Sequence, residues 1–495
     1  MESRKRFWTL AAWALLILSP FLQMGIISLF IGKNAFAAYP VWSDEMDYWR
    51  NLFSWIHVGL PKGYSGIGEY PAPVGTLSVH GLTPLLLYGG FAKVFGLNFH
   101  SIVIYNALWV SLGALALCLL VKPKAGQALF MAGLLMAYVP AVLYCVTSMT
   151  EMANYGLLMF YVAFLLRSHR TGGKVSFALA WVTVVFVCLY RISYFVLFLP
   201  LVWLGGGNRF SKKTVLYSLL ALVLSAVLYL LGAALTAPYP AGFLYNWLRA
   251  EDAATFFQMF FSHAKANLYD YFIRPTDSPM QDAMHWLYTA AMALSLGGTF
   301  LRLEKKERRW RVGFGLDKLH LGCFLMLFLP FAVVVMIYET NDWSDFRTLA
   351  PFLWGAAAVM ALGRRKALPA LALAGSMAMA AWLAVLPVQG AYGDEYRFTK
   401  QPYTERAQAA CEAIVYDPQA ESPWGNTIRA DLCTLQTISE IDAHMGLFYG
   451  WFTPETTGKS RWILTDHLKI VVEGYERVDD GPEAKVYRHV QSDEN

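Results

Sequence analysis

Three carboxylates lie close together in an aromatic-rich segment near the N-terminus: Asp44, Glu45 and Asp47. If the segment is helical, Asp44 and Asp47 share one side and Glu45 points elsewhere, because residues three apart lie on one helix face. A carboxylate can take the proton of an attacking hydroxyl and stabilise positive charge developing at a reacting carbon. The alternative is that Ser43 or Asp44 caps a helix whose first turn is acidic.

The composition describes the environment in which these carboxylates act. Of the 495 residues, 57% are apolar and 15% are charged, which excludes a water-soluble domain and indicates a polytopic membrane protein. The net charge of +5 comes from short basic loops between apolar stretches. Basic loops of this kind mark the cytoplasmic side of a membrane protein, so we predict no nucleic-acid partner from the positive charge.

Apolar stretches of roughly 20 residues predict about eleven transmembrane helices. They cover residues 8–31, 101–121, 127–149, 152–166, 175–190, 192–205, 214–236, 283–301, 319–338, 348–363 and 367–388. When the chain alternates sides, the lysine and arginine clusters all fall on one face, which the positive-inside rule makes cytoplasmic together with the N-terminus.

The opposite face carries two large loops, at about 32–100 and 237–282, and everything after residue 388. We therefore expect a transmembrane domain at 1–388 and a periplasmic α/β domain at 389–495, because the tail becomes mixed and charged. A terminal hairpin is expected around the turn at 479–482. The fold class is an α-helical polytopic membrane protein with a small soluble α/β domain.

Two of the six cysteines, Cys411 and Cys433, fall in this tail, and the other four lie inside apolar stretches. In an oxidising compartment such as the periplasm, each of the two has the other as its simple partner. We therefore predict a disulfide between them.

The order of motifs around the acidic cluster resembles that of a known superfamily. A first helix is followed by Asp44-Glu45 and Tyr48, a glycine- and tyrosine-rich stretch, and His80-Gly81-Leu82-Thr83-Pro84 before an amphipathic segment ending in Phe95-Gly96. Across about residues 1–388 this resembles the GT-C fold glycosyltransferases, among them protein O-mannosyltransferases and lipid A aminoarabinose transferases. Loop lengths and the shorter tail differ from the latter, so their lipid acceptor is not carried over.

The resemblance implies that a sugar moves, with inversion, from a polyprenyl-phosphate-linked donor. The acceptor would be a cell-envelope glycan, lipid or protein on the periplasmic face of a bacterial inner membrane. Asp44-Glu45 match the family's catalytic position, with Asp44 preferred as the base and Asp47 as a further candidate. Glu151 resembles a second acidic position near the donor, and a buried helix cap is the alternative.

A donor phosphate requires cations on the outer face, where few are present. Arg191 and Arg347 lie at outer helix ends and Lys62 lies in the first loop. A guanidinium fork matches phosphate oxygens bidentately, so the two arginines are the preferred ligands. The alternative is that they snorkel or pair with nearby carboxylates.

Other residues of the outer loops complete the predicted site. The expected substrate contacts are Tyr48, Trp49, His57, His80, Glu151, Asp342 and Asp345. Each kind of residue also has a structural alternative. Aromatic residues of the outer loops can anchor the membrane interface, and charged residues in short turns can cap helices. Histidines can be structural hydrogen-bonding residues.

Two points stay open at this stage. No cofactor is assigned, and a divalent cation, Mg²⁺ or Mn²⁺, is an alternative that three carboxylates alone do not establish. The competing functions are a transporter or flippase of lipid-linked saccharides and an outer-face polysaccharide polymerase or ligase. Transporters usually carry ionisable or broken-helix sites near mid-membrane, whereas here the acidic residues gather at the outer rim.

Overall fold

The structure is a computed structural model of the whole chain. It describes residues 2–59, 77, 80–205, 212–235, 250–276, 278–306, 309–337, 343–363, 365–385, 392–393, 396–399, 405–420, 423–431, 439, 441–449, 460–465, 474–480 and 485–490.

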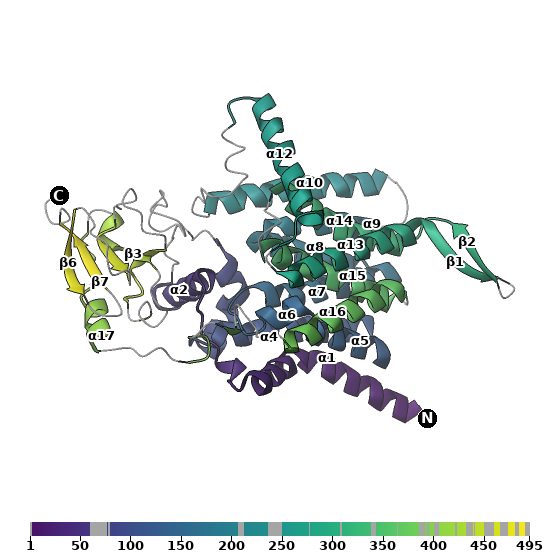
Figure 1. Cartoon of the computed structure of the whole chain (residues 1–495), viewed down its shortest axis with the longest axis horizontal. Coiled ribbons are helices and arrows are strands. Elements are labelled where there is room, and N and C mark those ends of the chain that lie inside the picture. The colour runs from purple at the N-terminus through teal and green to yellow at the C-terminus, as the bar shows by residue number, and fades with distance from the viewer. Residues whose placement is uncertain are drawn as a thin grey trace.

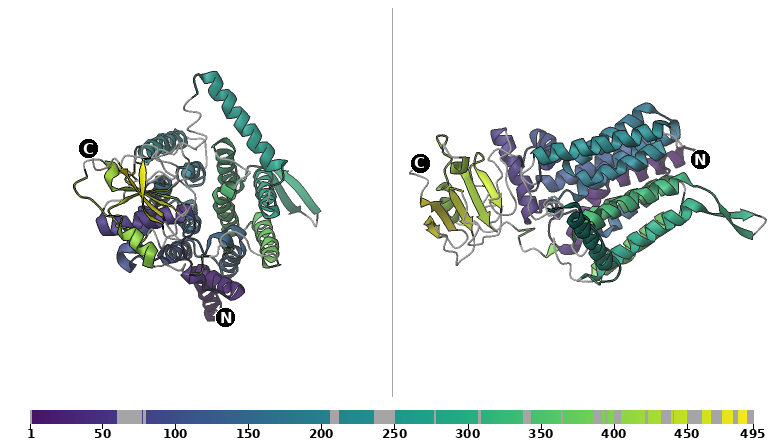
Figure 2. Two further views of the ribbon diagram at one scale, coloured as in Figure 1. Left: turned by 60° about the vertical axis from the view of Figure 1, so that its left-hand side comes forward. Right: turned by 90° about the horizontal axis from the view of Figure 1, so that it is seen from above.

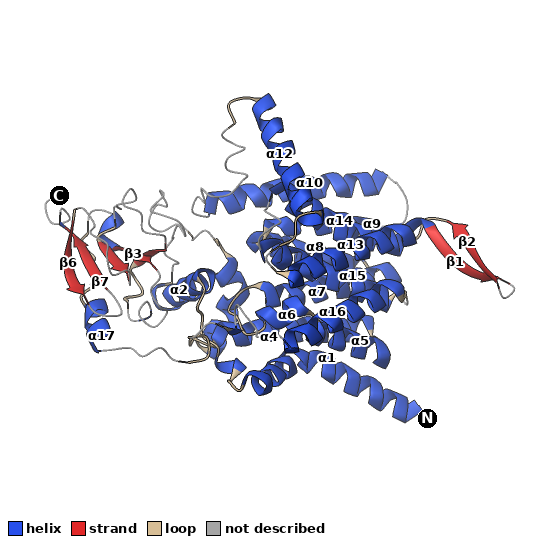
Figure 3. Cartoon of the chain, in the orientation of Figure 1, coloured by secondary structure: helices blue, strands red, loops and turns tan. Residues whose placement is uncertain are grey.

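Most of the described chain is helical (Figure 3). The long helices are α1 (Glu2–Ile31), α2 (Ser43–Val58), α4 (Ser101–Val121), α5 (Ala125–Ala137), α7 (Glu151–Thr171), α8 (Lys174–Tyr190), α10 (Lys212–Leu235), α12 (Ala253–Phe272), α13 (Pro279–Phe300), α14 (Lys318–Ile337), α15 (Trp343–Leu362) and α16 (Ala367–Val385). The shorter ones are η1 (Ala35–Ala37), η2 (Leu85–Gly89), α3 (Gly90–Phe95), α6 (Val139–Tyr144), η3 (Ile192–Leu197), α9 (Phe198–Gly205), α17 (Glu405–Glu412) and η5 (Pro423–Asn426).

Within the described residues, four helices are long and apolar enough to cross a membrane: α1, most of α10, α4 and α14. Six further apolar helices of 10–17 residues are shorter than a bilayer requires by themselves. The chain is thus a helical membrane protein, but the expected count of about eleven spans is not reached by this measure.

A proline explains why one of the expected transmembrane spans, at 127–149, is not a single long helix. The chain forms two helices there, α5 and α6, with an extended residue, Tyr138, between them. Pro140 stands in the first turn of α6, where its missing N–H is tolerated, whereas inside one continuous helix it would remove a hydrogen bond. The remaining expected spans each match a helix or a short pair of helices.

The helices form an elongated bundle whose two ends differ (Figures 1 and 2). The N-terminus and a hairpin of β1 (Leu301–Lys306) and β2 (Arg309–Phe314) lie at one end. A separate sheet near the C-terminus lies at the other end, and α2 lies between this sheet and the bundle. This β1–β2 hairpin is rich in arginine and lysine.

The C-terminal sheet has five strands in the order β4-β3-β5-β7-β6. They are β3 (Thr427–Asp431), β4 (Gly446–Tyr449), β5 (Trp462–Thr465), β6 (Tyr475–Asp480) and β7 (Lys485–His489). β3 pairs in parallel with β4 and β5, whereas β7 runs antiparallel to β5 and β6. The pairing of β6 with β7 confirms the expected terminal hairpin.

Helices α4 and α7 approach each other closely at a pair of glycines. A Cβ at Gly113 would overlap the Gly156 carbonyl, and one at Gly156 would overlap the backbone of Trp109. Small residues of this kind let two membrane helices pack backbone to backbone. This contact fixes the position of α7, whose first residue is Glu151.

Candidate functional site

The acidic segment forms the first turn of α2, and its carboxylates point in two directions. Asp44 keeps 32% of its side chain exposed, whereas Glu45 is completely buried. Asp47 is buried on the same side as Asp44, three residues further along the helix. The helical periodicity thus separates Glu45 from the other two, as expected.

A chain of ion pairs joins Asp44 to three other predicted residues. Arg347 approaches Asp44 Oδ2 with its Nη2 atom at 3.4 Å and donates from Nε to Glu151 Oε1 at 2.9 Å. Arg191 reaches the same Glu151 oxygen with its Nη2 atom at 3.5 Å. The cluster therefore joins residues far apart in sequence, from α2, α7, α15 and the start of η3.

His80 completes the cluster on the side of α2. Its Nε2 atom lies 3.6 Å from Asp44 Oδ1 and 3.9 Å from Asp47 Oδ2, and its Nδ1 atom lies 3.5 Å from the Tyr48 hydroxyl. The two rings make an edge contact with centroids 4.7 Å apart. The side chain of His80 thus lies between two carboxylates and one phenol.

Contacts within the cluster shift the pKa values of Asp44 and His80. Burial by itself raises the pKa of Asp44, but the hydrogen bond and charge of His80 and the charge of Arg347 outweigh it and lower that pKa well below its usual range. Burial opposes protonation of His80, yet Asp44 and Asp47 raise the pKa of the imidazole. Near neutral pH, Asp44 is therefore an anion and His80 tends toward its cationic form.

Glu151 is the buried centre of the network. Only 2% of it is exposed, and its Oε1 atom is shared by two arginines. Its second oxygen, Oε2, is buried without a hydrogen-bond partner. A buried carboxylate oxygen normally accepts at least one hydrogen bond. The Oε2 atom of Glu151 is therefore available to accept one from a ligand.

Asn106, which is not among the predicted site residues, positions the approach to Glu151. Its side-chain amide donates to the carbonyls of Met149 at 2.7 Å and Thr147 at 3.3 Å, just before α7. Its oxygen accepts a hydrogen bond of 2.8 Å from the Tyr88 hydroxyl. An amide inside an otherwise apolar span was the signal that could have identified it.

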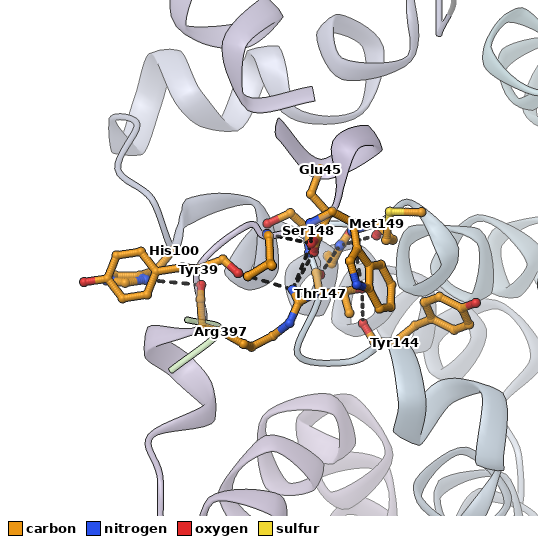
Figure 4. A network of polar contacts seen from close by, with 12 residues as sticks. Tyr39, Glu45, His100, Tyr144, Thr147, Ser148, Met149 and Arg397 are labelled. Carbon is orange, nitrogen blue, oxygen red and sulfur yellow. Dashed lines mark hydrogen bonds and ion pairs between the residues drawn. The ribbon is translucent and has the colours of Figure 1, made fainter. Parts of the chain in front are cut away.

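Glu45 belongs to a different network, which Figure 4 shows. Arg397 Nη1 lies 2.8 Å from its Oε1 atom and 2.9 Å from its Oε2 atom. The backbone N–H groups of Val41, Trp42 and Ser148 also donate to this carboxylate, at 2.9, 2.9 and 2.5 Å. With so many donors and no exposure, Glu45 is placed to hold α2 against the loop before α7, and not to meet a substrate.

The C-terminal region also holds α2 through main-chain carbonyls. Arg50, fully buried, donates to the carbonyls of Ile441 at 2.8 Å, Asp442 at 2.5 Å and Met445 at 3.3 Å. Ser54 donates to the Ala443 carbonyl at 2.8 Å. Arg50 therefore anchors α2 to the C-terminal segment.

Two predicted contacts lie elsewhere on α2. Trp49 is buried between Phe53 and Phe99 and donates to the Asn98 carbonyl at 3.2 Å, so it is a packing residue. His57 is exposed and packs on Phe53, about 15 Å along the helix from Asp47 at 1.5 Å per residue. Lys62, Asp342, Cys433 and the side chain of Asp345 lie outside the described residues, so their assigned roles and the disulfide with Cys411 stay predictions.

No group of three or more histidine, cysteine, aspartate or glutamate side chains is placed to hold a metal ion in the described part of the chain. A search of protein families and of curated proteins finds no match to this chain.

Proposed function

We propose that the chain is a membrane glycosyltransferase of the GT-C kind, which moves a sugar from a polyprenyl-phosphate-linked donor to a hydroxyl of a cell-envelope glycan, lipid or protein. One observation supports this most directly. An ionised carboxylate, Asp44, lies 3.4 Å from Arg347, which belongs to a two-arginine cluster on the buried Glu151. A base and an anion-binding pair thus lie side by side at one end of a membrane bundle.

The reaction would be a single displacement. The acceptor oxygen forms a bond to the anomeric carbon while the bond from that carbon to the phosphate oxygen breaks, and configuration inverts. The acceptor proton passes to Asp44, and the electron pair leaves with the polyprenyl phosphate. Arg191 would hold the donor phosphate and Arg347 would also stabilise the leaving group, because guanidinium groups bind phosphate oxygens bidentately.

Donor binding would also activate the base. The hydrogen bond and charge of His80 and the charge of Arg347 lower the pKa of Asp44 despite its burial, which makes its carboxylate a weak proton acceptor. A phosphate that occupies the fork of Arg347 weakens its pairing with Asp44 and adds negative charge nearby. Both effects raise the pKa of Asp44, so the base gains strength only when the donor is present.

The finer topology belongs to the same proposal. About eleven passes, some of them short or tilted, would place the Asp44 cluster and the C-terminal sheet on the periplasmic side of a bacterial inner membrane, with the N-terminus in the cytoplasm. Support comes from the arrangement of the two ends, since the N-terminus and the basic hairpin lie opposite the C-terminal sheet (Figure 1).

The test is release of polyprenyl phosphate from a labelled polyprenyl-phospho-sugar by membranes that contain the chain, with the native envelope as acceptor. Asp44→Asn should lower transfer by roughly 10²- to 10⁴-fold, the usual contribution of a general base. The matched control is Asp252→Asn, an exposed helix cap that asparagine replaces well.

Three outcomes are informative. Loss of sugar transfer with Asp44→Asn but not with Asp252→Asn supports the proposal. Full activity of a folded Asp44→Asn protein would remove the base and contradict it. Movement of the labelled lipid across the bilayer without cleavage would point instead to a flippase.

A further inference from the structure

A second site lies at the end of the bundle away from Asp44. A cavity of about 590 Å³ opens between α5, α15 and α16. Its lining includes Ala361, near the end of α15, whereas Arg347 lies near the start. At 1.5 Å per residue the two are about 21 Å apart along the helix, so the cavity is separate from the acidic cluster.

Three cations line this cavity: Lys124, Arg365 and Lys366. Arg365 is held by an ion pair with Asp317 at the start of α14. Lys124 and Lys366 are exposed, and neither makes an ion pair with a described acidic residue. One carboxylate against three cations leaves the cavity with an excess of positive charge.

Two helix N-termini reinforce that charge. α5 begins at Ala125 and α16 at Ala367, each directly after one of the cavity lysines. The first N–H groups of a helix and its dipole both favour an anion. Gln127 fixes the geometry, because its amide accepts from the Lys124 backbone at 3.0 Å and donates to the Ala361 carbonyl at 2.8 Å.

The rest of the lining is apolar. Phe130, Pro369 and Leu373 form walls that continue along α5 and α16. The outer surfaces of the same helices expose Leu129 at 48% and Met377 at 57%, as helices in contact with lipid tails do. The cavity therefore combines a cationic mouth with an apolar wall that runs into the bilayer.

We propose that this cavity binds one anionic phospholipid, with the headgroup phosphate at Lys124, Arg365 and Lys366 and an acyl chain along Phe130 and Leu373. A soluble phosphate would make no use of the apolar wall, and a zwitterionic lipid would carry a cation of its own to the mouth. Basic pockets between membrane helices are suited to acidic headgroups in this way. The proposal is independent of the sugar-transfer chemistry at the other end.

The test is lipid retention by the purified full-length protein in detergent, measured by native mass spectrometry. The probes are dioleoyl phosphatidylglycerol and dioleoyl phosphatidylcholine. The wild type should retain the former and release the latter. The double variant Lys124→Gln/Lys366→Gln should bind phosphatidylglycerol about 10- to 30-fold more weakly, because two lysines near an acidic headgroup are removed.

The matched control is Lys212→Gln/Lys213→Gln, which removes two exposed lysines from the start of α10. It should leave retention unchanged. A third variant, Ala370→Trp, fills the apolar part of the lining without changing charge and should also lower retention.

An equal loss of phosphatidylglycerol binding in the two double-lysine variants would show that any exposed lysines attract the lipid, and would overturn the proposal. So would equal retention of the two lipids, or displacement of phosphatidylglycerol by millimolar glycerol phosphate, which would indicate a site for soluble phosphate.

Discussion

Arg397 donates to both carboxylate oxygens of Glu45, at 2.8 and 2.9 Å, and both side chains are completely buried. Arg397 also donates to the Tyr39 carbonyl at 3.2 Å, and its guanidinium lies 4.8 Å from the centre of the Trp42 ring. In the sequence, Arg397 comes after α16, the last described helix of the bundle. It nevertheless fixes the start of α2, the helix that carries Asp44.

The first prediction is that Arg397→Met lowers the free energy of unfolding by about 3–5 kcal/mol, because it leaves Glu45 charged and unpaired in a buried site. The double variant Glu45→Gln/Arg397→Met should lose less, since no buried charge is left. Arg488→Leu, in the exposed pair with Glu476, is the control and should cost less than about 1 kcal/mol. Thermal unfolding in detergent measures all three, and equal losses for Arg397→Met and Arg488→Leu would contradict the assignment.

The second prediction separates the two arginines of the cluster. Arg347 contacts both Asp44 and Glu151, whereas the ion pair of Arg191 is with Glu151. Lysine keeps the charge but loses the fork, so Arg191→Lys should raise the KM for the donor about 10-fold with little change in kcat. Arg347→Lys should change both constants, because it also contacts the base.

Steady-state kinetics with the labelled donor measures this difference. Arg274→Lys, an exposed arginine paired with Asp270, is the control and should alter neither constant. Unchanged kinetics in both cluster variants would assign the phosphate to other donors.

The third prediction concerns pH. Although burial opposes its protonation and Arg347 lowers its pKa, Asp44 and Asp47 raise the pKa of His80 above its usual value of about 6.5. The folded state therefore binds the proton more tightly than the unfolded chain does. The resulting stabilisation is fully present below about pH 6.5 and is lost as the pH rises through the raised pKa. Asp44 stays ionised over this range, because its own pKa is lowered.

Melting temperatures measured between about pH 6 and 9 should show this loss in the wild type and a smaller one in His80→Gln. His57→Gln, which changes an exposed histidine of α2, should keep the wild-type pH dependence. Identical profiles for His80→Gln and the wild type would rule out this linkage.

The fourth prediction tests the contact that positions Glu151. Gly156→Ala should force α7 away from α4, because the new Cβ would overlap the backbone of Trp109. Overpacking of this kind typically costs 1–3 kcal/mol. Gly133→Ala, in α5 with open space around it, should be neutral or slightly stabilising. Melting curves that do not distinguish the two variants would show that the approach of α4 to α7 is dispensable.

Much of the cluster could be predicted from charge and topology alone. Charged groups are scarce in a membrane protein, so an acidic residue and an arginine at helix ends on one side have few partners except each other. Charge and topology select Asp44, Arg191 and Arg347, the family resemblance adds Glu151, and the structure brings these four residues together. Helix positions followed from hydropathy, although the expected span at 127–149 is divided into α5 and α6, with Pro140 in the first turn of α6.

The supporting contacts could not be predicted, because they depend on tertiary packing. Arg397 is one of many charges in a polar tail, and nothing local marks it as the partner of Glu45. The same holds for Arg50, whose acceptors are main-chain carbonyls almost four hundred residues away and have no sequence signature. The family resemblance predicts a catalytic role for Glu45, and the sequence predicts a substrate contact for Trp49. Neither pattern shows that Arg397 pairs with Glu45 or that Trp49 packs between Phe53 and Phe99.

The anchoring of α2 by residues 397 and 441–445 affects how the protein is made. The helix that carries Asp44 leaves the ribosome early, whereas its two anchors are synthesised after the last helix of the bundle. A chain that ends near residue 388 keeps the contact of Glu45 with the Ser148 backbone, but it lacks the contacts that α2 makes with Arg397 and with the carbonyls of residues 441–445. We therefore expect the start of α2, and Asp44 with it, to reach its final position only after the C-terminal residues have been synthesised.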